Sequence, residues 1–174
     1  MIRSMAGPLE CALEAYDGSD VGLLHQFRDA LEPNQARLKE AILLAGAPAV
    51  EVARGATWLI KEWLDRGVKC TPATVQVLTD QLVAMADPVV CQHIAQCLGS
   101  IRIPSVSAPR FVEFLERGCG SNRPFQRAWS MDGLVRLAEQ HGDYRPLAEA
   151  ALAAGMSDPA ASVRARARRI LDGS

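Results

Sequence analysis

Apolar residues recur three and four positions apart along most of the chain, which is the spacing of one face of an α-helix. Leu38, Ala41, Ile42 and Ala45 form one such stripe. No long run of alternating β-branched residues competes with this periodicity. The pattern predicts helices over residues 8–16, 21–31, 35–45, 48–66, 72–86, 88–100, 111–117, 124–140, 144–155 and 159–171. The fold class that follows is all-α.

Capping residues and prolines mark where these helices begin. Asp20, Asn34 and Thr71 stand directly before apolar stripes, where an oxygen-bearing side chain can accept from a free amide of the first turn. Asp87-Pro88 is a similar start, because a first-turn proline lacks only an N–H that has no partner inside the helix. We expect the other helix-opening prolines also to lie in the first turn.

Four prolines open every second helix at a nearly constant interval. They are Pro48, Pro88, Pro124 and Pro159, separated by 40, 36 and 35 residues. Two helices per period of this length are typical of an α-solenoid, whose hairpins bury their apolar faces against one another. We expect one domain over residues 1–174, a right-handed α-solenoid of four to five hairpins. Residues 1–20 are expected to be disordered or to form a weak capping helix.

The last of these periods resembles the second helix of a HEAT repeat. Residues 158–171 contain an Asp-Pro start, a Ser-Val-Arg triplet at 162–164, Ala167 and a closing Ile-Leu pair. The Asp87-Pro88 segment is similar but lacks the arginine. The resemblance covers residues 34–171 and implies a HEAT-repeat-like α-solenoid. Proteins of this family are mostly binding scaffolds, so the resemblance specifies a fold more closely than a function.

Charge and composition narrow the class of partner. The chain has 19 basic and 20 acidic residues and a net charge of −1, whereas a dedicated nucleic-acid binder usually has a basic excess. Five cysteines without a CxxC motif favour reduced thiols and a cytoplasmic location. No apolar stretch approaches the length of a membrane span, so we expect no membrane partner. We expect no cofactor.

One cluster of cysteine and histidine contains residue types that bind metal ions. In Cys91-x-His93-x-x-x-Cys97, His93 and Cys97 share a helix face, but Cys91 points elsewhere. Two ligands are too few for tetrahedral zinc, so we expect half-buried thiols, a surface histidine and no metal. Gly118-Cys119-Gly120 is interpreted as a turn, and the three histidines show no triad spacing.

A tryptophan among charged residues is the clearest candidate for a binding anchor. Residues Arg54, Trp58, Lys61, Glu62 and Asp65 fall on one face of the helix over 48–66. On that face Trp58 is either an exposed anchor for a partner, or a residue packed between repeats or covered by Arg54 through a cation–π contact.

Non-enzymatic protein binding is the function we expect, on a concave surface lined by the second helix of each hairpin. Enzymatic activity is not expected, although the sequence does not decide it. The polar sides of those helices supply the candidate contact residues for a protein or peptide: Arg54, Trp58, Lys61, Gln92, Gln96, Arg127 and Arg164. The partner's identity and the oligomeric state do not follow from the sequence.

The alternative is a DNA-binding enzyme. Trp129, Asp132 and Arg136 share a helix face and resemble, by residue type, the groups that HEAT-like alkylpurine DNA glycosylases use on a concave surface. Nucleic acid is the less favoured partner because the chain is not basic. The arginine cluster at Arg164, Arg166, Arg168 and Arg169 has two interpretations, a solvated helix end or a site for an anionic partner.

Overall fold

The computed structural model describes residues 7–173, and every regular element in that range is helical. The α-helices are α1 (Pro8–Leu13), α2 (Val21–Ala30), α3 (Gln35–Leu44), α4 (Val50–Asp65), α5 (Pro72–Gln81), α6 (Pro88–Gln96), α7 (Ala108–Cys119), α8 (Pro124–Gln140), α9 (Arg145–Met156) and α10 (Ala161–Leu171). Two 3₁₀ turns, η1 (Cys97–Gly99) and η2 (Gly142–Tyr144), extend α6 and precede α9. The all-α prediction is confirmed.

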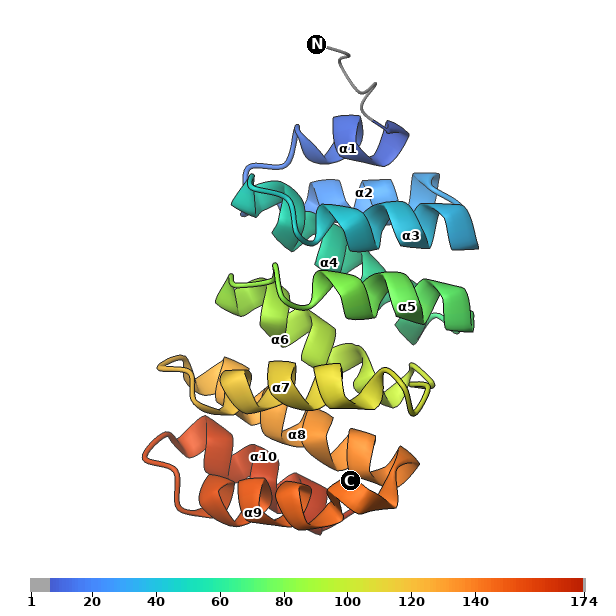
Figure 1. Cartoon of the computed structure of the whole chain (residues 1–174). Helices are drawn as coiled ribbons and strands as arrows, with labels where there is room; N and C mark the ends of the chain where they lie inside the picture. The colour runs from blue at the N-terminus through green and yellow to red at the C-terminus, as the bar shows by residue number, and fades with distance from the viewer. Residues whose placement is uncertain (1–6, 174) are drawn as a thin grey trace.

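The helices are stacked along one direction from α1 to α10, in two rows (Figure 1). Helices α3, α5, α7 and α9 form the row nearer the viewer, and α4, α6, α8 and α10 lie behind them. Along the rear row, α2 packs on α4, α4 on α6, α6 on α8, and α8 on α10. Each helix of the rear row therefore contacts the helices before and after it in the row.

The predicted caps account for three helix starts. The side chains of Asp20, Asn34 and Thr71 accept hydrogen bonds from the amides of Leu23, Arg37 and Thr74, each three residues on. Pro72, Pro88 and Pro124 occupy the first turns of their helices, as expected.

The same expectation was wrong for two prolines. Pro48 and Pro159 lie before α4 and α10, which begin at Val50 and Ala161 after the uncharged N-caps Ala49 and Ala160. The fixed φ of proline suits the start of a turn as well as the first turn of a helix. A proline that is followed by a residue in an extended conformation therefore does not mark the first turn of a helix.

The core lies between the two rows. Five apolar residues of α4 are buried there: Val52, Ala56, Leu59, Ile60 and Trp63. Small residues let helices approach closely: a Cβ at Gly133 of α8 would lie 2.6 Å from Cδ2 of Leu115 in α7. The helix predicted over residues 72–86 is shorter in the structure, since α5 ends at Gln81. Val83 follows the end of α5 and is 76% exposed.

Of the N-terminal residues 1–20, the structure describes those from residue 7 onward. Residues 8–13 form the capping helix α1, whose Leu9 and Leu13 are buried, and residues 1–6 lie outside the described range. In residues 7–173, no helix combines the length and hydropathy needed to traverse a lipid bilayer.

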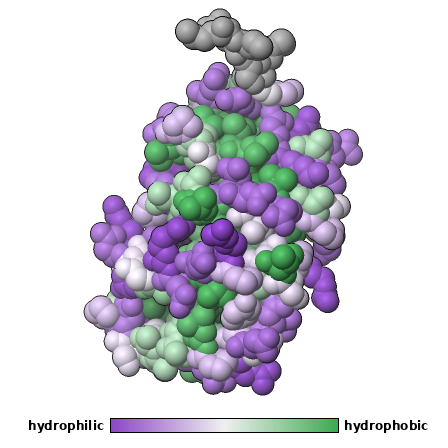
Figure 2. All heavy atoms as spheres, in the orientation of Figure 1, coloured by the Kyte–Doolittle hydropathy of each residue, from purple (hydrophilic) through white to green (hydrophobic). Residues whose placement is uncertain are grey.

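The near face, formed by α3, α5, α7 and α9, is chemically mixed. Figure 2 shows polar side chains over much of it, with apolar patches between them. This face therefore presents no continuous apolar surface.

Candidate binding surface

The outward side of the rear row, which we call the second-helix face, holds the sequence-predicted contact residues. It is formed by α2, α4, α6, α8 and α10, which pack side by side. Its residues fall into three groups: arginine–aspartate junctions between successive helices, an ion-pair chain on α2 and α4, and an arginine–tryptophan cluster on α8 and α10.

The junction between α4 and α6 is closed by a two-point ion pair. Arg54 of α4 donates from Nε and Nη2 to the carboxylate of Asp87, at 3.0 and 2.7 Å. Asp87 also caps α6 by accepting from the amides of Val89 and Val90. Burial alone would raise the pKa of Asp87, but hydrogen bonds from Arg54 and from these amides outweigh it and lower the pKa. Arg54 therefore binds within the chain and does not cover Trp58.

The junction between α8 and α10 repeats this arrangement. Arg127 of α8 donates to both carboxylate oxygens of Asp158, at 2.8 Å each, and Asp158 accepts from the amide of Ala160. The hydrogen bond from Arg127 lowers the pKa of Asp158. Arg164 donates to the carbonyl oxygens of Asp158 and Pro159. The predicted contact residues Arg127 and Arg164 thus hold one turn together.

The intervening junction, between α6 and α8, lacks this pair. Asp87 and Asp158 each stand directly before a proline, and the residue directly before Pro124 is Arg123. Arg127 lies 31 residues before Asp158, and Gln92 lies 31 residues before Arg123. No side chain caps α8. Both the arginine and the aspartate of the flanking junctions are therefore replaced here.

A groove opens at this junction. It has a volume of about 430 Å³, and we call it the α6–α8 groove. The residues that line it are Arg54, Asp87, Pro88, Val89, Gln92, Arg123, Pro124, Phe125 and Gln126. Phe125 is 62% exposed. Two predicted contact residues, Arg54 and Gln92, are brought together in this groove.

Arg123 and Phe125 are absent from the sequence-predicted contact residues. The sequence does contain a signal for Arg123. The residues directly before Pro88, Pro124 and Pro159 are Asp87, Arg123 and Asp158, so the charge changes sign at the middle position. Phe125 carries no such signal, because the spacing of apolar residues along the chain does not show that this ring is exposed.

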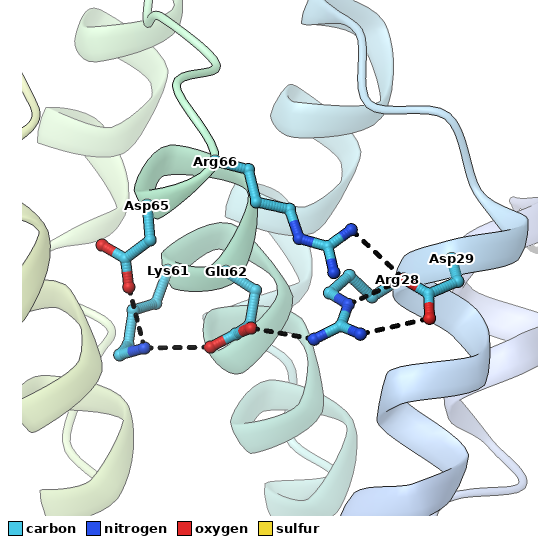
Figure 3. Close-up of polar contacts among 6 residues, drawn as sticks. All are labelled: Arg28, Asp29, Lys61, Glu62, Asp65 and Arg66. Atoms are coloured by element: carbon cyan, nitrogen blue, oxygen red, sulfur yellow. Dashed lines mark hydrogen bonds and ion pairs between the residues drawn. The ribbon is translucent and has the colours of Figure 1, made fainter.

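The predicted contact residue Lys61 belongs to a chain of ion pairs on α2 and α4 (Figure 3). Successive contacts of 2.9–3.2 Å join Asp65, Lys61, Glu62, Arg28, Asp29 and Arg66 in that order. The hydrogen bond from Arg28 lowers the pKa of Asp29. Three cations and three carboxylates alternate, so the chain carries no net charge.

Trp58 is half-buried and packs against α2. Its ring meets the His25 ring edge-on, with the centroids 5.0 Å apart and the planes at 83°. Packing between successive helices therefore accounts for part of the Trp58 surface, and the rest of the indole remains accessible on the second-helix face.

Trp129 and Asp132 of α8 form a cluster with two arginines. The guanidinium of Arg166 on α10 stacks over the Trp129 ring, 3.6 Å from its centroid, and pairs with the Asp132 carboxylate. Arg136 approaches Asp132 from the other side, with Nε at 3.4 Å from Oδ1. Asp132 itself is only 3% exposed. The three residues of the alternative prediction do lie together, but their carboxylate is enclosed by two cations.

The terminal arginines behave in two ways. Arg164 and Arg166 are used within the chain, as described above, whereas Arg168 and Arg169 are exposed in the last turn of α10. The solvated helix end is therefore formed by the last two members of the cluster.

The cysteine–histidine segment lies largely inside the molecule. Cys91 and Cys97 are buried, and burial raises the pKa of the Cys91 thiol to about 11. His93 is half-buried, with Nδ1 3.0 Å from the Thr57 hydroxyl oxygen, so the expectation of a surface histidine was wrong. Burial lowers the pKa of His93 to about 4. Across residues 7–173, no group of three or more metal-ligating side chains is close enough to hold a metal ion.

Gln96 differs from the other candidates. It is half-buried on α6, and its Oε1 atom is buried with no hydrogen-bond partner in residues 7–173. A buried amide oxygen without a hydrogen-bond donor destabilises the fold. Gln96 differs in this respect from a surface glutamine, whose amide is hydrated.

Comparison with protein-family models, with curated proteins and with solved structures gives no match to this chain. The geometry of the chain's own residues therefore carries the functional inference.

Proposed function

We propose that this chain is a non-enzymatic protein-binding scaffold, built as a right-handed α-solenoid of HEAT-like hairpins, whose second-helix face is concave and receives a protein partner. The successive packing of α4, α6, α8 and α10 supports the repeat, because each hairpin covers the apolar side of the next. The two arginine–aspartate junctions support it further, because they recur at equivalent places. The cytoplasm is the proposed location, in keeping with the buried thiols of Cys91 and Cys97.

The observation that carries this proposal is the presence of accessible aromatic rings on a face of mixed charge. Trp58, Phe125 and Trp129 all retain exposed surface on the outward helices. Around Trp58 the charges cancel in the ion-pair chain of Figure 3. Protein interfaces combine aromatic anchors with a mixed polar rim, whereas a phosphate backbone requires a field of one sign.

Site-specific photo-crosslinking tests the proposed face. A benzophenone amino acid is placed at Gln92 or Gln96 on α6, and at exposed Gln76 on α5 or Glu149 on α9 as controls, and each full-length variant is irradiated in lysate. We expect a discrete crosslinked protein from the α6 positions only. Equal crosslinking from all four positions, or crosslinking from α5 and α9 alone, contradicts the proposal.

A second candidate function is DNA binding by a glycosylase-like enzyme. The observation in its favour is that Trp129, Asp132 and Arg136 gather in one cluster with Arg166. The enclosed carboxylate counts against it, because Asp132 must become accessible before it can act on a substrate.

Retention on immobilised duplex DNA distinguishes the two candidates. A DNA-binding enzyme is retained at low salt and released as the salt concentration rises, since bound cations displace counterions. We expect no retention at 50 mM salt, which removes the second candidate. Salt-dependent retention that Trp129→Ala abolishes would favour the enzyme instead.

A further inference from the structure

We propose that the α6–α8 groove binds an extended acidic segment of the protein partner, with a carboxylate at Arg123 and an apolar side chain against Phe125. This inference rests on the proposed function and specifies the chemistry of the partner. It follows from the interrupted series of arginine–aspartate junctions, from the charge of the groove and from its exposed ring.

The flanking junctions show what the middle one lacks. Between α4 and α6, and again between α8 and α10, an arginine is neutralised by an aspartate that precedes a proline. At the middle junction the residue before the proline is itself an arginine, and Gln92 stands where the preceding helix would supply the cation. The position directly before Pro124 therefore has no carboxylate.

The groove consequently carries a positive charge. Arg54 and Asp87 line it and cancel each other through their two-point pair. Arg123 is exposed, and among residues 7–173 no carboxylate lies within ion-pair distance of its guanidinium. The remaining charge of +1 favours a carboxylate-bearing occupant and disfavours a basic one.

Phe125 adds a second requirement, which is that the occupant of the groove carries an apolar side chain. Its ring is 62% exposed beside Arg123 at the start of α8, and Val89 adds apolar surface across the groove. An exposed aromatic ring next to a cation matches a segment with a large apolar residue close to an aspartate or glutamate.

A protein segment fits these features better than a nucleic acid. The groove has one uncompensated cation, whereas binding to a phosphate backbone depends on several cations that act together. The volume of about 430 Å³ suits a few side chains of an extended peptide.

The test is selection of a random 12-residue peptide library, displayed on phage, against the full-length chain. Selected sequences are then synthesised with a fluorescent label, and their dissociation constants are measured by anisotropy. We expect the selected peptides to contain Asp or Glu next to a large apolar residue. We expect Arg123→Asp to weaken their binding at least tenfold and Phe125→Ala to weaken it several-fold.

Arg102→Asp is the matched control, since Arg102 is exposed and lies outside the groove. It changes the net charge by the same amount, and we expect it to leave the affinity within twofold. Circular dichroism and thermal melting establish that each variant is folded before its affinity is interpreted.

Several outcomes overturn the inference. Selection of neutral or basic peptides does so, as does equal loss of affinity in Arg123→Asp and Arg102→Asp, and so does a library that yields no binder. If the selected peptides bind Arg123→Asp with unchanged affinity but no longer bind Trp58→Ala, the α6–α8 groove is not their binding site. The binding surface is then another part of the second-helix face. Crosslinking at Gln92 and Gln96 then decides the proposed function separately.

Discussion

Asp87 shows how much one residue contributes when it serves two helices. Its carboxylate accepts from two amides of α6 and from the guanidinium of Arg54 in α4. The acidic side chain has to be short enough to cap its own helix and still face the helix before it. This dual role explains why an aspartate, rather than a glutamate, precedes Pro88.

Replacing Asp87 with alanine removes both roles. We expect the free energy of unfolding to fall by about 2 kcal/mol, the sum expected for a lost cap and a lost partly buried ion pair. Urea titration followed by circular dichroism measures the change. Glu113→Ala, which breaks an exposed pair with Arg110, serves as control and should cost under about 0.5 kcal/mol. Equal effects of the two substitutions would contradict the role given to Asp87.

His93 should make the stability of the chain depend on pH. Burial lowers its pKa to about 4 from the ordinary value of 6.5, so between these values the unfolded chain binds more protons than the folded chain. The contribution of neutral His93 to stability is therefore complete above pH 6.5 and is lost as the pH falls towards 4.

His93→Gln should reduce this dependence, because glutamine does not titrate. We expect the variant to lose less stability than the wild-type chain between pH 7 and pH 5, as measured by urea titration at each pH. His25→Gln, at an exposed position, is the control and should follow the wild-type profile. Parallel profiles for all three proteins would show that His93 is not the titrating group.

At the scale of whole helices, the sequence correctly predicted which helices exist and in which order they follow along the chain. Apolar periodicity placed all ten α-helices that the structure describes between residues 7 and 173, and cap residues such as Asn34 and Thr71 located the starts of two of them, because both signals act within one turn. Prolines were a weaker guide, as Pro48 and Pro159 show.

Contacts between helices were the part that sequence could not predict. Arg54, Lys61, Arg127 and Arg164 were predicted as partner contacts, yet all four bind within the chain. Their acceptors lie up to 33 residues away or depend on the turn geometry, and local periodicity holds no information about such pairs. Arg123 was overlooked for the same reason, since its significance lies in the aspartates of the other junctions.

The interrupted junction can be repaired by substitution. Arg123→Asp would create the Asp-Pro sequence found at residues 87–88 and 158–159, and we expect it to cap α8 as Asp87 caps α6 and to add about 0.5–1 kcal/mol to the free energy of unfolding. Adding Gln92→Arg should then contribute about 1 kcal/mol beyond the sum of the single changes.

A double-mutant cycle in urea measures that coupling. Gln92→Arg alone should not stabilise the chain, because it adds a second cation to a groove that already holds Arg123. Strict additivity of the two substitutions would show that positions 92 and 123 do not form the equivalent of the Arg54–Asp87 pair.

Across the whole molecule, burial is uneven along the stack. Helix α4 buries nine of its residues, whereas α9 buries only Ala148 and Gly155, and α10 only Val163 and Ala167. In a stack where each hairpin depends on its neighbours, a helix pair with little buried surface opens first.

Native-state hydrogen exchange should reveal this gradient. We expect amides of α9 and α10 to exchange at least tenfold faster than amides in the middle of α4, because opening the last hairpin exposes less apolar surface. Uniform exchange from α4 to α10 would indicate one globally cooperative unit rather than stacked hairpins.

Hydrogen exchange also provides the most direct test of where the partner binds. The chain is compared alone and in complex with the protein recovered by crosslinking at Gln92 or Gln96. Protection concentrated in the outward residues of α4, α6 and α8, including the start of α8 at Phe125, is the expected result. Protection confined to α3, α5, α7 and α9 would contradict the assignment of the second-helix face as the binding surface.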